Sequence, residues 1–366
     1  MATTKKKLSG QILEVPPAKP GMVLKGDPEL AEARAVLFRA QVRESQALRR
    51  IMDGAVKKIE DSAGAQPVTV DDTRMLKASE RSATKAAEKG IRDAFVEADH
   101  EVEAGVRRSI SRATRAQVAH LEKLGIRPPT PEQIRRIRES VANLMNEEFP
   151  PGSGMTYSMR MELNRREHTR QIKGVLRQKY PDGGASQRIA RDVKVGLTDT
   201  RSVRTPLRGG SASKKLRRII VAEETRLANR AEVAIMRVSG VAFAYWRLNP
   251  THPWYGGREV CEWYASRTDS ATVDILATLG ITLPASALQG LYRLDNYPDY
   301  PHPFCKCYPE PWFPTKFKPK LRELSSAAQA TGRSTADLLA AGSAMVIGAL
   351  SVERARKREA ELEESP

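Results

Sequence analysis

Three cysteines and two histidines fall within one short stretch of the sequence: His252, Cys261, His302, Cys305 and Cys307. Thiolates and imidazoles are the usual ligands of tetrahedral zinc, and a closed four-ligand site can stabilise a segment that has little regular structure. Zn²⁺ is therefore the one cofactor that this sequence suggests. The spacing differs from that of a standard zinc finger, because Tyr264 stands where a second cysteine would complete a Cys-x-x-Cys pair.

Three interpretations of this cluster stay open. In the first, a metal is bound by His252, Cys261, His302 and one or both of Cys305 and Cys307. In the second, Cys261 forms a disulfide with Cys305 or Cys307, and in the third the cysteines are reduced and buried beside a packed histidine. Other catalytic signatures are absent, since the sequence has no P-loop, no Gly-x-Ser-x-Gly and no His-Glu-x-x-His. We therefore expect no enzyme activity, and a zinc-dependent hydrolase or nuclease centred on His252, Cys261 and His302 is the alternative.

The chain is strongly basic, with 61 Lys and Arg against 44 Asp and Glu, a net charge of +17 and a pI near 9.9. Residues 151–240 hold 20 of these cations and only eight of the acids. Such a stretch binds phosphate backbones without sequence preference, and its few aromatic residues argue against recognition by base stacking. The candidate DNA-binding residues are Arg188, Arg191, Lys194, Arg201, Arg204, Arg208, Lys214, Lys215, Arg217 and Arg218.

Helical signals dominate the elements that must position these residues. Asp27 followed by Pro28 predicts a helix start, Thr130 followed by Pro131 predicts another, and Gly240 is expected to end a third. The predicted helices begin at residue 28, cover 73–125, follow Pro131 and cover 219–237, and a strand is predicted over 241–248. Within the predicted helix over 219–237, we expect Glu223 and Glu224 to be exposed acids that face Arg226 and Arg230.

The predicted fold class is mainly α with a small α+β C-terminal module. It comprises an elongated N-terminal helical region, a compact, irregular Cys/His-containing domain over the proline-rich residues 249–316, and a C-terminal helix from Ser334 to about Glu364. The expected domains are a flexible basic arm (1–26), a helical docking region (27–150), a basic helical or linker region (151–218), the small domain (219–316) and the C-terminal helix (317–366).

Several protein classes are not expected from this sequence. Three cysteines in 366 residues do not make a disulfide framework. No secretory signal is visible and no uncharged apolar run reaches the ~20 residues of a membrane span, so we expect a soluble protein in a reducing cytoplasm. The small residues Ala340, Ala344 and Gly348 recur at four-residue spacing, which gives the alternative of an ejected, membrane-active protein.

The motif residues of the C-terminal half point to a family. The family's pattern is a helix with Glu followed six residues later by Asn, then a strand with Gly-Val, Tyr and Trp, a His-Pro pair, a Cys, and a Pro…His-Pro-x-Cys-x-Cys ending. The chain matches this order at Glu223, Arg226 and Asn229, Gly240-Val241, Tyr245-Trp246, His252-Pro253, Cys261 and Pro298 to Cys307. Residues 186–313 thus resemble the C-terminal domain of phage Mu F-like minor head proteins, the phage head morphogenesis family.

The resemblance implies a minor capsid component that is associated with the portal vertex of a virion. Its expected roles are in head assembly and in DNA packaging or ejection. The expected partners are the portal protein, the major capsid or scaffold protein and, without sequence preference, double-stranded DNA. No small-molecule substrate and no membrane partner are expected. The expected location is the virion, at the capsid interior or portal vertex. During assembly, the expected location is the host cytoplasm.

Overall fold

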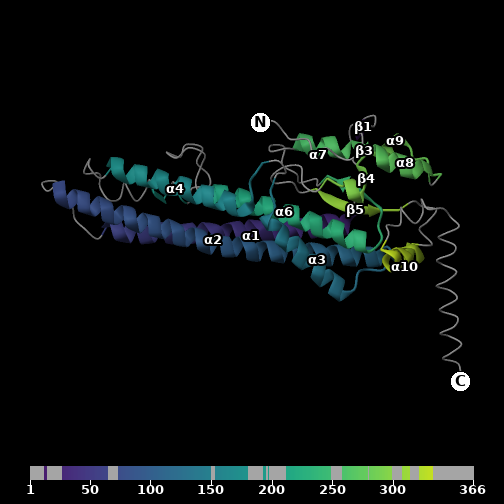
Figure 1. Cartoon of the computed structure of the whole chain (residues 1–366), viewed down its shortest axis with the longest axis horizontal. Helices are drawn as coiled ribbons and strands as arrows, with labels where there is room; N and C mark the ends of the chain where they lie inside the picture. The colour runs from purple at the N-terminus through teal and green to yellow at the C-terminus, as the bar shows by residue number, and fades with distance from the viewer. Residues whose placement is uncertain are drawn as a thin grey trace, which may run out of the picture. The chain divides into compact units, whose positions relative to one another are not determined.

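The computed structural model describes residues 12–14, 27–64, 73–149, 153–179, 193–194, 197, 212–248, 258–278, 280–298, 307–313 and 321–332. Of these residues 78% are helical, and the C-terminal region adds a small antiparallel sheet (Figure 1). The predicted fold class is therefore confirmed. Residues 333–366, which include the predicted C-terminal helix and its small-residue spacing, lie outside the described residues.

Long helices account for most of the described chain. They are α1 (Pro28–Gly64), α2 (Thr73–Lys123), α3 (Pro131–Asn143) with the short η1 (Leu144–Asn146), α4 (Tyr157–Lys179) and α6 (Ala212–Val238). None of the described helices combines the length and the apolarity that a membrane-spanning segment requires.

Local signals set the ends of these helices as the sequence predicts. The Asp27 carboxylate accepts hydrogen bonds from the backbone N–H groups of Glu29 and Leu30, at 2.8 and 3.1 Å, and so caps α1. Thr130 and Gln133 form a reciprocal capping box at α3. Gly240 ends α6 at φ +77°, a conformation that favours glycine. Its N–H donates to the carbonyl of Arg237, and the next N–H donates to that of Met236, as in a Schellman motif.

The larger sheet has the strand order β4-β2-β5 and is antiparallel throughout. Its strands are β2 (Phe243–Arg247), β4 (Leu291–Arg293) and β5 (Tyr308–Trp312). The predicted strand over 241–248 is confirmed by β2, which lies in the centre. β5 contains Pro309 and Pro311, which fits its position at an edge, where one side of the strand needs no ladder hydrogen bonds.

The prediction that residues 249–316 are irregular is wrong for most of their described part. Besides β4 and β5, this part contains α7 (Arg258–Ala265), β3 (Arg267–Asp269), α8 (Ser270–Thr278), α9 (Ala285–Leu288) and η2 (Leu294–Asn296). These elements are too short to show a clear period in the sequence, and the strands depend on partners elsewhere in the chain. Another helix, α10 (Leu321–Thr331), follows; it lies within the expected C-terminal helical domain (317–366) but ends before the predicted helix start at Ser334.

A second, two-stranded sheet joins β3 to β1 (Ile12–Glu14). These three N-terminal residues lie inside the stretch predicted to be a flexible arm, and the rest of that stretch is outside the described residues. Gly290 connects the two sheets. At φ +72°, it donates to the carbonyl of Arg267 and accepts from the N–H of Trp246. A Cβ atom at Gly290 would lie 3.0 Å from the Trp246 carbonyl oxygen, so this close approach favours glycine.

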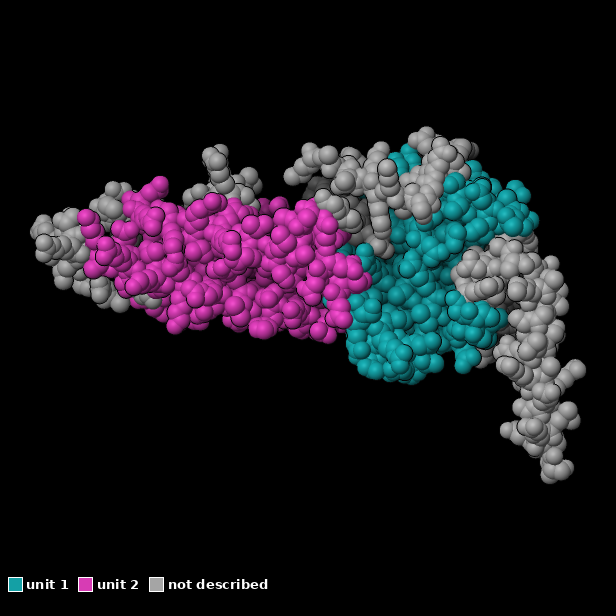
Figure 2. Space-filling view, viewed as in Figure 1, with its two compact units in different colours: residues 1–37, 109–142, 225–366 teal, residues 38–108, 143–224 magenta. Residues whose placement is uncertain are grey.

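The chain divides into two compact units, which Figure 2 distinguishes by colour. Unit 1 comprises residues 1–37, 109–142 and 225–366, and unit 2 comprises residues 38–108 and 143–224. Helices α1, α2 and α6 each contribute residues to both units. Unit 1 contains both sheets, whereas the described part of unit 2 is helical.

Candidate functional site

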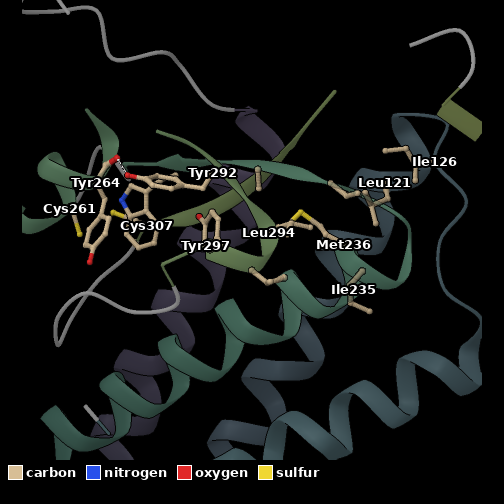
Figure 3. Close-up of a cluster of buried hydrophobic side chains, with 14 residues drawn as sticks. Leu121, Ile126, Ile235, Met236, Cys261, Tyr264, Tyr292, Leu294, Tyr297 and Cys307 are labelled. Carbon is tan, nitrogen blue, oxygen red and sulfur yellow. Dashed lines mark hydrogen bonds between the residues drawn. The ribbon is translucent and has the colours of Figure 1, made fainter. Parts of the chain in front are cut away.

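The two candidate metal ligands that the structure describes lie in the hydrophobic core of unit 1. Cys261 on α7 and Cys307 just before β5 are both fully buried. They belong to one hydrophobic cluster with the aromatic side chains of Trp246, Tyr264 and Tyr292 (Figure 3). The burial of Tyr264 raises the pKa of its hydroxyl.

The other candidate ligands, His252, His302 and Cys305, lie outside the described residues. Among the residues that the structure describes, no group of three His, Cys, Asp or Glu side chains could hold a metal ion. The zinc site therefore stays a prediction, and so does each of the alternative states of the cysteines.

Helix α6 carries the glutamates that the sequence analysis expected at the surface, and that expectation is wrong. Glu223 and Glu224 have exposed fractions of 0%. The Arg160 guanidinium of α4 donates to the Glu223 carboxylate and forms an ion pair with it. The physical reason is that α6 is buried on nearly every face over residues 219–236, so its polar side chains have no exposed face to occupy.

The side chains of Glu224 and of a second buried acid, Glu44 of α1, both lie close to Gly105 of α2. A Cβ atom at Gly105 would lie 2.6 Å from Glu224 Oε1 and 3.1 Å from Glu44 Oε2. The Arg108 guanidinium donates to Glu44 at 2.9 Å and to Glu101 at 2.7 Å. Unit 2 therefore places carboxylates from two helices in its interior, and nearby arginines balance part of their charge.

Asn229, the second polar residue of the family motif, lies in unit 1. Its side-chain oxygen accepts a hydrogen bond of 2.5 Å from Arg34, which also forms an ion pair with Glu232. Burial raises the pKa of Glu232 to about 7, and Arg34 opposes that rise. Arg226 is buried as well, with an exposed fraction of 1%. Glu223, Arg226 and Asn229 are thus all buried, and Glu223 and Asn229 form contacts between helices.

The described candidate DNA-binding residues lie mainly on the first turns of α6. Arg217 and Arg218 are exposed, Lys214 and Lys215 are half-buried, and Lys194 is exposed. Lys215 donates to the Glu167 carboxylate of α4 at 2.5 Å and lowers the pKa of that carboxyl. The remaining candidates, Arg188, Arg191, Arg201, Arg204 and Arg208, lie outside the described residues.

A basic groove on α4 was not predicted. It has a volume of about 500 Å³, and five of its seven lining residues are cationic: Arg165, Arg166, Arg170, Lys173 and Arg177, with Thr169 and Gly174. Arg165 and Arg166 pair with Glu162, and Lys173 pairs with Glu88. The sequence signal was the spacing of Arg166, Arg170, Lys173 and Arg177, which puts these residues on one helix face.

The groove on α4 and the start of α6 both belong to unit 2. Helices α4 and α6 run antiparallel, since Arg160 contacts Glu223 whereas Glu167, further along α4, contacts Lys215. The later residues of α4 are therefore on the side of the first turns of α6. Arg170, Arg177, Arg217 and Arg218 are exposed and form no ion pair within the described part of the chain. These four arginines are hereafter the arginine surface.

Comparisons with protein-family models, with curated protein sequences and with solved structures find no match to this chain. The resemblance to Mu F-like head proteins therefore rests on the motif residues themselves.

Proposed function

We propose that this chain is a minor capsid protein of a tailed phage that acts in head morphogenesis at the portal vertex and contacts packaged or passing DNA without sequence preference. The order of motif residues from Glu223 to Cys307 supports the family part of the proposal. The observation that carries the DNA contact is the arginine surface of α4 and α6.

Duplex DNA fits this surface better than single strands do. The only aromatic side chain of α4 in the described residues is Tyr157, which is buried and donates to Asp99 at 2.6 Å. With no exposed ring on which bases can stack, binding depends on the phosphate backbone. On α4, Arg170 and Arg177 are seven residues apart, about 10 Å along the helix axis, so they can contact different phosphates.

The DNA contact is tested by titrating duplex DNA of arbitrary sequence with the full chain at several salt concentrations. The variants are Arg170→Gln/Arg177→Gln and Arg217→Gln/Arg218→Gln. The matched control is Arg43→Gln/Lys57→Gln, which removes the same charge from exposed residues of α1. The slope of log K against log salt is negative, and each lost phosphate contact reduces its magnitude by about 0.9. We expect each arginine-pair variant to reduce that magnitude by about 2, and the control variant to leave it near the wild-type value.

Equal affinities and equal slopes for the control and for both arginine pairs would overturn the DNA contact. The portal part of the proposal has its own test, immunogold labelling of purified particles with an antibody against the chain. Label at a single vertex supports the proposal, and label over the whole shell, or none, contradicts it.

A further inference from the structure

Within unit 2, helices α1 and α2 form the walls of a second groove, with a volume of about 320 Å³. Its floor is made mainly of small side chains, and its two walls carry opposite charges. The α1 wall contributes Arg50 and Lys58, the α2 wall contributes Glu97 and Glu101, and the remaining lining residues are Ala47, Ile51, Gly54, Ala55, Gly90 and Ala94.

The two helices run antiparallel, which fixes the residues that lie level with each other. A Cβ atom at Gly105 would lie 3.1 Å from the side chain of Glu44, and one at Gly90 would lie 3.4 Å from that of Ile59. From Glu44 to Ile59 the residue number rises by 15 along α1, and the neighbouring position on α2 falls by 15, from Gly105 to Gly90. The same register places Arg50 of α1 level with the turn of α2 that begins at Glu97.

Arg50 and Glu97 thus face one groove at one level, carry opposite charges and are both exposed. They form no ion pair with each other or with any other residue that the structure describes. Glu101, by contrast, already receives a hydrogen bond from Arg108. A surface that fits this groove must place an acid against Arg50 and a base against Glu97.

We propose that the surface that covers this groove is the same face of a second copy of the chain. A two-fold axis parallel to the groove places the α1 wall of one copy over the α2 wall of the other without shifting residues along the helices. Arg50 of each copy then faces Glu97 of the partner subunit, so the ion pair forms twice, as an isologous interface requires. An axis across the groove would instead place like charges together.

The small side chains of the floor allow the two copies to approach closely. Residues 47–58 cover only ~16 Å of helix axis, so the contact is at the small end of specific interfaces. We therefore expect a dimer that dissociates on dilution, with a Kd on the order of micromolar.

Sedimentation equilibrium of the full chain at low salt tests the proposal. Arg50→Glu and Glu97→Arg each turn both pairs into repulsive contacts, so each variant should weaken dimerisation by about tenfold or more. The double variant Arg50→Glu/Glu97→Arg restores opposite charges at both positions and should dimerise as the wild type does. The matched control Lys57→Glu reverses an exposed charge on α1 outside the groove and should leave the Kd unchanged.

A mixture of the two single variants gives the sharpest result. In a mixed dimer, Glu at position 50 faces Arg at position 97 in one pair, and Arg50 faces Glu97 in the other. Two proteins that each dimerise weakly should therefore form a tighter heterodimer when combined. Circular dichroism at 222 nm establishes that every variant is folded.

The proposal is overturned if the wild type stays monomeric at about 100 μM, which would leave a different protein as the occupant of the groove. It is equally overturned if the single variants dimerise as the wild type does, or if neither the double variant nor the mixture regains dimerisation. None of these results bears on the DNA titration, whose arginine variants are on α4 and α6.

Discussion

The core of unit 1 is mainly aromatic around its sheet, whereas the core of unit 2 is mainly aliphatic, with the rings of Phe95, Phe149 and Tyr157 as exceptions. In unit 1, Trp246 of β2 has ring centroids 5.6 Å from those of Tyr264 and Tyr297. Tyr292 adds a hydrogen bond of 2.7 Å from its hydroxyl to the Tyr264 carbonyl. A few large rings thus fill the space between short strands and helices, and each ring buries a large apolar area.

Unit 2 is built differently, from long helices with small contact residues. Its fully buried side chains include Leu48, Met52, Ile91, Ile172 and Leu216, together with many alanines. Helix packing of this kind brings carboxylates of the helices, such as those of Glu44 and Glu223, into the interior beside arginines.

The difference shows two ways in which a chain with 5% aromatic residues can build cores. Short strands and helices depend on a few large side chains, so single truncations there should be costly. Long helices spread their stability over many small contacts, and they are sensitive instead to the charge and shape of a few buried positions.

The largest expected effect comes from Trp246→Ala, which breaks the aromatic core. Trp246 is 2% exposed, and such a truncation leaves a cavity that costs about 3–5 kcal/mol. All four tryptophans lie within residues 246–312, so tryptophan fluorescence reports on unit 1. Urea unfolding followed by fluorescence should therefore show a much lower midpoint for the variant.

The half-buried Trp263 supplies the matched control, since it lies at the margin of the same cluster. Trp263→Ala should cost roughly half as much, because part of its ring is already in water. Equal losses for the two variants would mean that the aromatic core has no single centre, and the contrast between the units would weaken.

A smaller effect is expected from pH, and it belongs to unit 2. His168 of α4 is 0% exposed, and neither ring nitrogen has a hydrogen-bond partner in the described part of the chain. Burial, and then the charge of Lys215, lower its pKa to about 4, against an ordinary value of 6.5. As the pH falls from 6.5 towards 4, His168 binds a proton in the unfolded chain but not in the folded chain. Stability is therefore full above pH 6.5 and should fall by roughly 3 kcal/mol towards pH 4.

His168→Leu removes this proton linkage and so isolates it from the titration of carboxylates. Urea unfolding followed by circular dichroism at 222 nm, at pH 7 and at pH 4.5, gives the stability loss of each protein. The wild type should lose more than the variant does. Equal losses would show that His168 is protonated in the folded protein, against the burial seen here.

The sequence predicted the features of this fold that depend on neighbouring residues. Helix caps at Asp27 and Thr130 and the stop at Gly240 were correct, because each cap is formed by residues within one helical turn. The short elements between residues 249 and 316 were missed, since β3 pairs with Ile12–Glu14, more than 250 residues away in the sequence.

The candidate sites divide in the same way. The clustering of cations over residues 151–240 was visible in the sequence, but which of them stay exposed depends on how α4 and α6 pack. The burial of Glu223 and Glu224 could not be predicted, because a periodic pattern of polar residues normally marks a solvent-exposed helix face. Only the covering helices make that face internal.

The smallest expected effect reverses sign between two glycines of unit 2 and so tests whether buried charge controls its helix packing. Alanine is a better helix former than glycine by about 1 kcal/mol, so Gly→Ala within a helix normally stabilises. Gly174 of α4 has open space around its Cβ position, and Gly174→Ala should raise stability by about 0.5–1 kcal/mol. Gly105→Ala would place a methyl group 2.6 Å from the Glu224 carboxylate, which is fully buried and would have to shift within the packed interior. Overpacking of this kind costs about 1–3 kcal/mol, which exceeds the gain in helix propensity, so Gly105→Ala should destabilise the chain in the same urea assay. If both variants were stabilised, Glu224 would have room to move, and the carboxylates above Gly105 would not constrain how α1, α2 and α6 pack.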